Sequence, residues 1–476
     1  MVIFLFTVLL TSWFRLWSRL RSRLRTNFRK STISKDRNRR AQIAALILLL
    51  PVQSAYPALT DIEYKIIQQV AENEAAAREL LEEVVNINSG TMNLEGVREV
   101  GKRFDRAFKH LGFKTRWIDG TPFQRAGHLI ATHGNAGPKL LLIGHLDTVF
   151  TRDSPLKRYQ ELANNKVKGP GITDMKGGDV VMLYALAALK GAGALDRISV
   201  TIILTGDEER RGRPLKLAIH ELVKAGRWAD FAIGFEDGDG DPSTAVISRR
   251  GSTRWQLTVT GRAAHSSQIF REDYGYGAIY ETARILNDFR ETLSTEPNLT
   301  FNPGLILGGT EVNTKTGANS GQASGKNNVI AKTTLVRGDI RALTPAQLSK
   351  AQTVMQRITA DNLNKTSAQL EFFDGYPPMA PRENNRRLLN IYDQISQDLG
   401  FGKVNAVDPR NAGAADISFV AEHVEMAIDG LGLMGSGGHT ENEIADMNTL
   451  LQQTQRAAIL FHRLADRWQP RQLLSR

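Results

Sequence analysis

Acidic and imidazole side chains recur in short glycine-rich segments along the chain, and their types suit a metal site. The segments read GHLD, GITDMKGG, TGDEERRG, GFED and GSGGHTENE. The chain has no cysteine, so any metal must be held by histidine and carboxylate groups. Such donors are typical of zinc, manganese or cobalt in a water-accessible catalytic site. Two histidines and several carboxylates are enough for two ions that share a bridging carboxylate, the arrangement used in metal-assisted hydrolysis.

The segments that carry these side chains are placed by predicted strands and helices. KLLLIGHLDTVF, ISVTIILTGDEE and ADFAIGFED each start as a buried strand and end in polar residues, and predicted helices lie between them. The periodicity also predicts one long helix over residues 60–87 and another over 96–112. Strands that alternate with helices indicate a mostly parallel α/β sheet. Ligands of such sheets bind beyond the carboxyl ends of the strands, where the polar segments fall.

The alternation is interrupted in the middle of the chain. Residues 248–375 follow a β-α-β-β-α-β order, the split βαβ or ferredoxin-like pattern. Within them, residues 308–328 form a stretch rich in Gly, Asn, Ser and Thr that is typical of a mobile loop. We therefore predict a catalytic α/β domain in two parts, residues 56–247 and 376–476, interrupted by a smaller α+β domain over 248–375.

The N-terminal segment 1–55 carries almost all of the net charge of +11. Its first 40 residues hold 11 Lys and Arg and a single acid, whereas the rest of the chain holds 50 basic and 49 acidic residues. The body of the protein is thus close to neutral, which argues against nucleic-acid binding. The order KDRNRR, IAALILLLPV, QSA is that of a secretory signal peptide. We therefore expect a periplasmic or secreted protein, and a cytoplasmic location is the alternative.

The part of the leader upstream of this signal has two interpretations. LLTSWFRLWSRLRSRLR spaces apolar residues among arginines at helical intervals, a pattern that could contact an anionic membrane surface. Alternatively, residues 1–35 are an upstream extension of the reading frame.

Six segments together resemble a known family. GHLDTVF, GITDMKGG, TGDEERRG, GFED, GRAAHSS and GSGGHTENE, in this order, look like the di-zinc metallopeptidase family of glutamate carboxypeptidase, acetylornithine deacetylase, succinyl-diaminopimelate desuccinylase and aminoacylase. The resemblance covers nearly all of residues 60–470, and the spacing is most similar to the glutamate carboxypeptidase branch. It implies two Zn²⁺ per subunit, with Mn²⁺ or Co²⁺ as alternatives. It also implies that the inserted domain is a lid that forms the interface of a homodimer.

The resemblance implies a role for each residue at the strand ends. His145 and Glu236 would bind one ion, Glu209 and His439 the other, and Asp174 would bridge them. The Asp174–Met175 peptide would be cis. Asp147 would orient His145 through its ring N–H, and Glu208 would be the general base. The remaining charges of this stretch, Asp207, Arg210 and Arg211, are left without a role, although the arginines could offset the local charge.

Three residues of the lid would act on the substrate. By resemblance, His265 would reach the active site of the partner subunit and stabilise an oxyanion, and Asn328 and Arg341 would hold the carbonyl or carboxylate of the substrate. The alternatives are a surface histidine in a monomer and an exposed strand arginine. The chain departs from the family at Ala331, where relatives often have proline, and in the longer loop before Asn328.

These observations predict a hydrolase that cleaves an amide bond beside a free carboxylate in a small peptide or N-acyl amino acid. An exported, glutamate carboxypeptidase-like carboxypeptidase is the leading hypothesis. An N-acyl-amino-acid deacylase is the alternative enzyme. A non-catalytic binding protein that keeps the fold is the third possibility, and the presence of every metal position and of Glu208 argues against it.

Overall fold

The computed structural model describes residues 59–314 and 320–467, so the predicted leader over 1–55 lies outside the described residues. Within the described part, no helix has both the length and the apolar character needed to cross a bilayer.

The main sheet has six strands in the order β1-β2-β6-β3-β7-β16. Its four strands β6, β3, β7 and β16 run parallel, and β2 and β1 continue the sheet in antiparallel pairings. The strands are β1 (Lys114–Asp119), β2 (Gly127–His133), β3 (Lys139–His145), β6 (Ser199–Thr205), β7 (Phe231–Gly234) and β16 (Met426–Ile428). The predicted mostly parallel α/β sheet is therefore confirmed.

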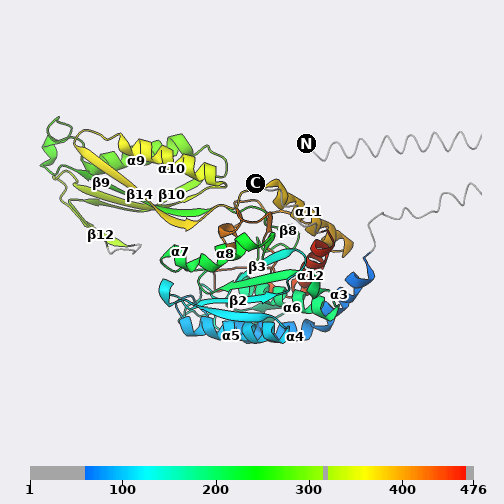
Figure 1. Cartoon of the computed structure of the whole chain (residues 1–476). Helices are drawn as coiled ribbons and strands as arrows, with labels where there is room; N and C mark the ends of the chain where they lie inside the picture. The colour runs from blue at the N-terminus through cyan, green and yellow to red at the C-terminus, as the bar shows by residue number, and fades with distance from the viewer. Residues whose placement is uncertain (1–58, 315–319, 468–476) are drawn as a thin grey trace, which may run out of the picture. The chain divides into compact units, whose positions relative to one another are not determined.

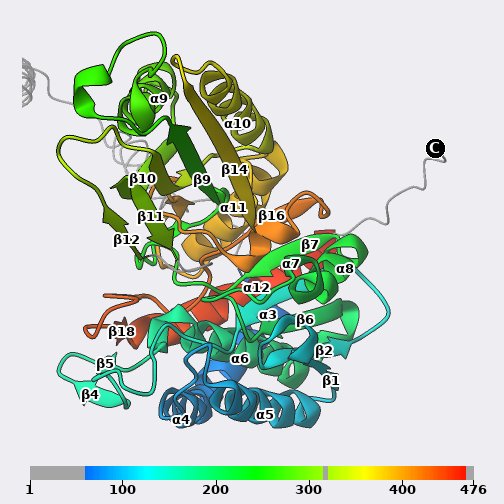
Figure 2. The ribbon, with the colours of Figure 1, turned by 90° about the vertical axis from the view of Figure 1, so that its left-hand side faces the viewer.

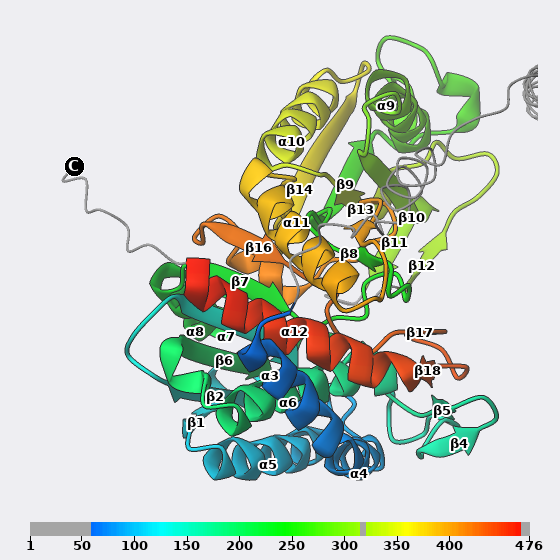
Figure 3. The same ribbon diagram turned by 90° about the vertical axis from the view of Figure 1, so that its right-hand side faces the viewer.

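Helices cover both faces of this sheet because its central strands are apolar on both sides (Figure 1). Along β3, Leu140 and Leu142 belong to one hydrophobic core and Leu141 and Ile143 to another, as the alternation of a strand requires. The larger core takes its helical side chains from α3 (Asp61–Glu72), α4 (Glu74–Val85), α5 (Leu94–His110), α6 (Gly177–Gly191), α11 (Glu383–Asp398) and α12 (Asn448–Arg467). Figure 3 shows α12 running beside α3 and α6. The other core is closed by α8 (His220–Trp228).

A small second sheet joins two loops that are far apart in the sequence. Its order is β17-β18-β5-β4, and it consists of β4 (Gln160–Leu162), β5 (Lys166–Lys168), β17 (Gly435–Ser436) and β18 (Ile444–Asp446). Because β18 pairs with β5, the loop that contains His439 is tied to the segment that leads to Asp174. The GITDMKGG and GSGGHTENE segments are thus brought together by strand pairing.

The inserted segment forms its own antiparallel sheet, in the order β10-β13-β9-β14. The strands are β9 (Ser252–Gly261), β10 (Thr300–Gly309), β13 (Thr333–Arg341) and β14 (Thr366–Tyr376). Two helices, α9 (Gly277–Leu293) and α10 (Pro345–Ala360), pack on one face over a core that includes Trp255 and Phe289 (Figure 2). This is the predicted split βαβ pattern.

Two local predictions were wrong. The predicted single helix over residues 60–87 is two helices, because Asn73 ends α3 and begins α4; asparagine competes for backbone hydrogen bonds and favours helix ends. The predicted mobile loop over 308–328 contains a hairpin of β11 (Glu311–Thr314) and β12 (Gly321–Ser324). The Thr and Val residues that alternate with polar ones in β11 suit a short strand.

Candidate metal centre and active site

The metal-type side chains lie together because three parallel strands end at the same edge of the sheet. His145 is the last residue of β3, Glu208 and Glu209 follow β6, and Glu236 follows β7. The carboxyl ends of parallel neighbours meet at one edge. These four residues therefore lie at the same edge of the sheet, as the sequence analysis predicted from their positions after buried strands.

Asp174 lies between the two histidines. Its Oδ1 is 3.0 Å from Nε2 of His145, and its Oδ2 is 2.8 Å from Nε2 of His439. The Asp174–Met175 peptide bond is cis, as the resemblance implied. Each oxygen of one carboxylate therefore faces a different imidazole, which is the geometry expected of a bridging ligand.

Two groups of possible ligands share this aspartate. His145, Asp174 and Glu236 form the first, and Asp174, Glu209 and His439 form the second, with the ligand atoms of each group within 4.8 Å of one another. Nε2 of His145 is 3.6 Å from Glu236, and Nε2 of His439 is 3.3 Å from Glu209. The structure thus brings together all five residues that the sequence analysis assigned as ligands, in the same pairing. Glu208 belongs to neither group.

The pKa values at this centre are those of buried carboxylates lying against two histidines. Burial raises the pKa of Glu209 to about 8 and that of Glu236 well above its ordinary value. Hydrogen bonds to Asp174 and Glu209 raise the pKa of His439 to about 11. For Asp174, burial acts to raise the pKa, but hydrogen bonds to both histidines outweigh it and the pKa is lowered. Without a metal, protons would have to supply the charge that the buried carboxylates require.

The donor set fits a pair of divalent ions. Oε1 of Glu209 is buried and has no hydrogen-bond partner among the described residues, so this oxygen is available as a ligand atom. His439 lies in the left-handed region with a φ of 62°, a conformation that costs about 1 kcal/mol or more for a side chain with a Cβ. Such outliers cluster at functional sites. Oxygen and imidazole donors without thiolate suit zinc, manganese or cobalt.

Asp147 contacts the ring of His145 as expected, and does so through its backbone carbonyl. The ring Nδ1 of His145 is 2.9 Å from the backbone carbonyl of Asp147, whereas the nearest carboxylate oxygen of Asp147 is 3.6 Å away. The carboxylate instead accepts hydrogen bonds from the amides of Glu208 and Glu209, at 3.0 and 3.2 Å, and from the hydroxyl of Thr91 at 2.6 Å. Asp147 therefore orients His145 through its main chain and fixes the two glutamates through its side chain.

Glu443, a residue to which the sequence analysis gave no role, holds the loop of Asp174. Its buried carboxylate accepts hydrogen bonds from the amides of Gly171, Thr173 and Asp174 at 2.8–3.2 Å, and from the hydroxyl of Thr173. It lies four residues after His439 in the segment GSGGHTENE, and that position was the available signal. Glu443 thus links the loop of Asp174 to the loop of His439.

Arg211 neutralises part of the acidic stretch, as the sequence allowed. It is 6% exposed, forms ion pairs with Asp207 and Asp416, and donates a hydrogen bond to the hydroxyl of Tyr376 at 2.8 Å. The same hydroxyl donates to the backbone carbonyl of Glu208 at 2.7 Å. This network, which the local sequence pattern could not reveal, holds the main chain of the predicted base.

A second buried arginine, Arg249, supports the main chain of Glu236 through an aspartate. Nε of Arg249 is 3.0 Å from Asp429, and Asp429 accepts a hydrogen bond from the amide of Glu236 at 3.3 Å. Neither residue was found from the sequence, because they lie 180 positions apart. The Arg249–Asp429 pair thus holds the main chain of Glu236 and leaves the carboxylate of Glu236 available as a ligand.

The three predicted substrate residues of the lid do not contact this centre. His265 is exposed, and Nδ1 of its ring is 2.9 Å from the hydroxyl of Ser267. The backbone carbonyl of Asn328 accepts a hydrogen bond from Ser266, and its side chain is exposed. Arg341 pairs with Asp339 on the same strand at 3.1 Å. Their proposed roles therefore stay predictions.

The parallel α/β sheet, its inserted α+β domain and the two ligand groups that share Asp174 define a co-catalytic metallohydrolase. Residues 141–466 match Peptidase family M20/M25/M40, and the chain belongs to this family. The protein is therefore a hydrolase of the metallopeptidase and amidohydrolase type, which confirms the resemblance.

The chain is similar to several known proteins. It is 26% identical to carboxypeptidase G2 of Pseudomonas sp. (strain RS-16) over 408 residues, which are 83% of this chain and 91% of the relative. It is 30% identical to a probable succinyl-diaminopimelate desuccinylase of Staphylococcus aureus (strain Mu50 / ATCC 700699), over 36% of this chain and 42% of the relative. The crystal structure of aminopeptidase PepT from Bacillus cereus ATCC 10987 shares the fold with a TM-score of 0.65, at 17% identity, over 83% of this chain and 99% of that one.

Replacing Glu208 by glutamine tests the division of labour between the neighbouring glutamates. The change preserves size but removes the base, so turnover should fall by about 10² or more while two metal ions per chain remain bound. Elemental analysis and initial rates measure both quantities. Glu209→Gln is the matched control and should lose metal. If Glu208→Gln loses metal instead, the roles of the two residues are exchanged.

Proposed function

We propose that the protein is a di-zinc carboxypeptidase that cleaves the amide bond next to a free carboxylate, in the manner of a glutamate carboxypeptidase. The observation that carries the proposal is the pair of ligand groups sharing Asp174, with Glu208 beside them and outside both groups. The similarity to carboxypeptidase G2 over 91% of that relative supports the substrate class. An N-acyl-amino-acid deacylase uses the same chemistry and is supported by the desuccinylase relative.

His145, Asp174, Glu236, Glu209 and His439 would hold the two ions. Divalent zinc supplies Lewis acidity toward a carbonyl oxygen and lowers the pKa of a coordinated water from 15.7 toward about 7. Glu208 accepts the proton of the attacking water and passes it to the leaving nitrogen. Burial raises the pKa of the Glu208 carboxyl group.

The position of Glu208 is set by its backbone. Its amide is bound by Asp147 and its carbonyl by Tyr376, so the peptide unit on each side of the residue is fixed. Its side chain is not needed for either contact. A base held in this way can move its proton without rearrangement of the loop, which is the preorganisation that general-base catalysis requires.

A matched pair of substrates tests the requirement for a free carboxylate. The zinc-loaded protein should hydrolyse N-acetyl glutamate or a dipeptide that ends in glutamate. It should be about tenfold to a hundredfold less active on the same compounds with the α-carboxylate converted to an amide, because a charged hydrogen-bond partner is lost. Initial rates with and without a chelator measure the effect.

The same assay separates the two enzyme hypotheses. A preference for the dipeptide supports the carboxypeptidase, and a preference for the acetyl compound supports the deacylase. Absence of hydrolysis of all four compounds by metal-loaded protein would contradict both.

We further propose that the active form is a homodimer joined through the lid. Large apolar side chains that are 36–57% exposed gather on this domain: Phe270, Tyr276, Ile279, Tyr280 and Ile306. The ring of Phe270 is 5.5 Å from that of Tyr276 and 5.4 Å from that of Tyr280, so the aromatic members form one patch. Exposed apolar patches of this kind mark interaction surfaces. In a two-fold dimer, each lid would present His265 to the other subunit.

Mixing two inactive variants tests the dimer and the role of His265 together. After dissociation and reassociation of His265→Ala and Glu208→Gln subunits, one site of a mixed dimer combines an intact base with an intact histidine. Activity should reappear in the mixture, at about half of the wild-type value per mixed dimer, because one of its two sites is intact. Light scattering and differential tags confirm that subunits have exchanged. If exchange occurs and activity stays absent, His265 acts within its own chain or not at all.

We also propose that the protein is exported, and this proposal rests only on the sequence of residues 1–55. The order of basic, apolar and small residues over 35–55 supports cleavage near Ser54 or Ala55 and release into the periplasm or medium. Mass spectrometry of the mature protein measures its first residue. A mature chain that keeps residues 36–53 would overturn the proposal.

A further inference from the structure

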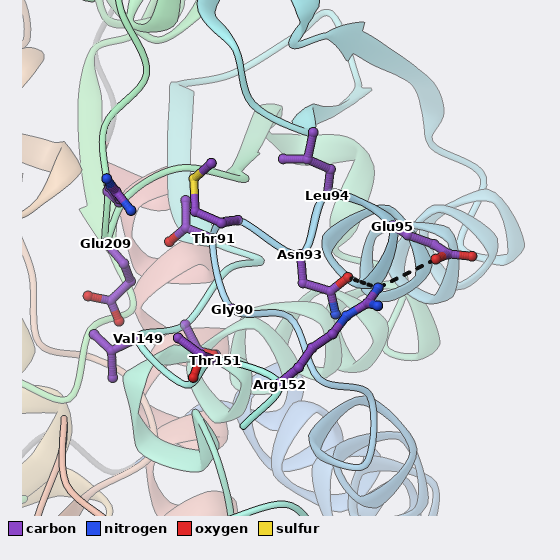
Figure 4. Close-up of a pocket in the computed structure, with 12 residues that line it drawn as sticks. Gly90, Thr91, Asn93, Leu94, Glu95, Val149, Thr151, Arg152 and Glu209 are labelled. Atoms are coloured by element: carbon purple, nitrogen blue, oxygen red, sulfur yellow. Dashed lines mark hydrogen bonds and ion pairs between the residues drawn. The ribbon is translucent and has the colours of Figure 1, made fainter. Parts of the chain in front are cut away.

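A pocket of about 700 Å³ opens directly beside the metal centre. Its walls are the segment Gly90–Glu95, the residues Thr148, Val149, Thr151 and Arg152, and the pair Glu209 and Arg210. Figure 4 shows most of these side chains around the pocket. Glu209 belongs both to the second ligand group and to the wall of the pocket. A substrate whose amide bond lies at the metals therefore has this space next to the reacting carbon or nitrogen.

The walls of the pocket are preformed. The amide of Thr91 donates to the carbonyl of Thr148 at 3.1 Å, and the amide of Thr148 donates to Ser89 at 3.0 Å. The side chain of Asn88 donates to the carbonyl of Phe150 at 3.0 Å. A Cβ at Gly90 would lie 2.4 Å from that same carbonyl, so this close approach of the two segments requires glycine. Two segments tied in this way keep the pocket open without a ligand.

The lining combines exposed apolar side chains with two arginines, Arg152 and Arg210, and two glutamates, Glu95 and Glu209. Met92 is 54% exposed and Val149 is 36% exposed, which is a large area of apolar surface to leave in water. Arg152 donates a hydrogen bond to the side-chain oxygen of Asn93 at 2.6 Å and forms an ion pair with Glu95 at 3.6 Å. Arg210 is exposed, and within the described residues no carboxylate lies at ion-pair distance from its guanidinium. Arg210 is thus the cation that a bound anion would meet.

We propose that this pocket is an acyl subsite: it binds an acyl substituent with an apolar body of several carbons, and Arg210 pairs with a carboxylate at the far end of that substituent. The inference rests on the proposed amide hydrolysis and specifies the substrate class of the same site. A volume of about 700 Å³ is in the range of pockets that hold drug-sized ligands and far exceeds what an acetyl group needs. A guanidinium is suited to recognising a carboxylate.

Three N-acyl glutamates test the subsite: the acetyl compound, the octanoyl compound, and an analogue of the octanoyl compound with a carboxylate on its terminal carbon. We expect wild-type protein to prefer both long acyl groups over acetyl in kcat/KM, and the carboxylate-ended compound over the octanoyl compound. In Arg210→Gln, the ratio between these two long substrates should fall by about fivefold to tenfold, since one charge pair at a partly exposed site is lost. The change should be mainly in KM.

Two further variants act as controls. Arg158→Gln removes an exposed arginine that does not line the pocket and should leave that ratio unchanged. Val149→Glu places an acid on the apolar wall and should lower kcat/KM for both long substrates relative to acetyl. Circular dichroism checks that each variant is folded.

The outcomes separate this inference from the proposed function. If wild-type protein hydrolyses the acetyl compound as well as the long ones, the acyl subsite is wrong and the amide hydrolysis stands. If the long substrates are preferred but Arg210→Gln leaves their ratio unchanged, the role of Arg210 is wrong. If the metal-loaded protein hydrolyses none of the three and no dipeptide, the proposed function fails and the subsite fails with it.

Discussion

The constraint on which this structure depends is the crowding of buried negative charge at one edge of a sheet. The strands β3, β6 and β7 end in acidic segments that the parallel arrangement forces together. Removing an isolated carboxylate from water costs several kcal/mol even after the protein relaxes, so each acid needs a partner of its own. The fold divides the acids into two sets. Asp207, Asp416 and Asp429 form ion pairs with Arg211 and Arg249, whereas the carboxylates of Asp174, Glu209 and Glu236 lie against His145 and His439.

This division is consistent with the different roles predicted for the adjacent residues Glu208 and Glu209. Glu208 and Glu209 both donate their amides to Asp147, so one buried carboxylate sets the backbone of both. Their side chains then diverge: Glu209 is 3.3 Å from His439, and Glu208 belongs to neither ligand group. The carbonyl of Glu208 is also bound by Tyr376, at the end of the last strand of the inserted domain. The main chain of the predicted base is therefore held by residues from two other parts of the chain.

The sequence predicted the residues at the strand ends well and their supporting partners poorly. His145, Glu209 and Glu236 were found because a buried strand followed by a polar residue is a local pattern. Arg249, Asp429 and Tyr376 were missed because an ion pair across 180 residues leaves no local trace. The contact of Asp147 with His145 was predicted, but for the same reason the hydrogen bonds of its carboxylate to Glu208 and Glu209 were not: spacing shows which side of a strand a residue takes, but not which of its atoms bonds. The break at Asn73 was missed because the apolar periodicity continues through it.

The contacts of Asp147 also affect which residues around the site can change without disturbing the metal centre, and therefore how substrate preference can vary. The chemistry at the metals requires the same donors whatever the acyl group, so differences in specificity must lie in the surrounding walls. One wall is attached to the catalytic residues directly, because the hydroxyl of Thr91 donates to the carboxylate of Asp147 at 2.6 Å while its neighbour Met92 lines the pocket. A change of backbone at Thr91 would therefore reach the amides of both glutamates through a single carboxylate. Side chains such as Met92, Val149 and Arg210 can vary without that consequence, since Asp147 is held by Thr91 and not by them.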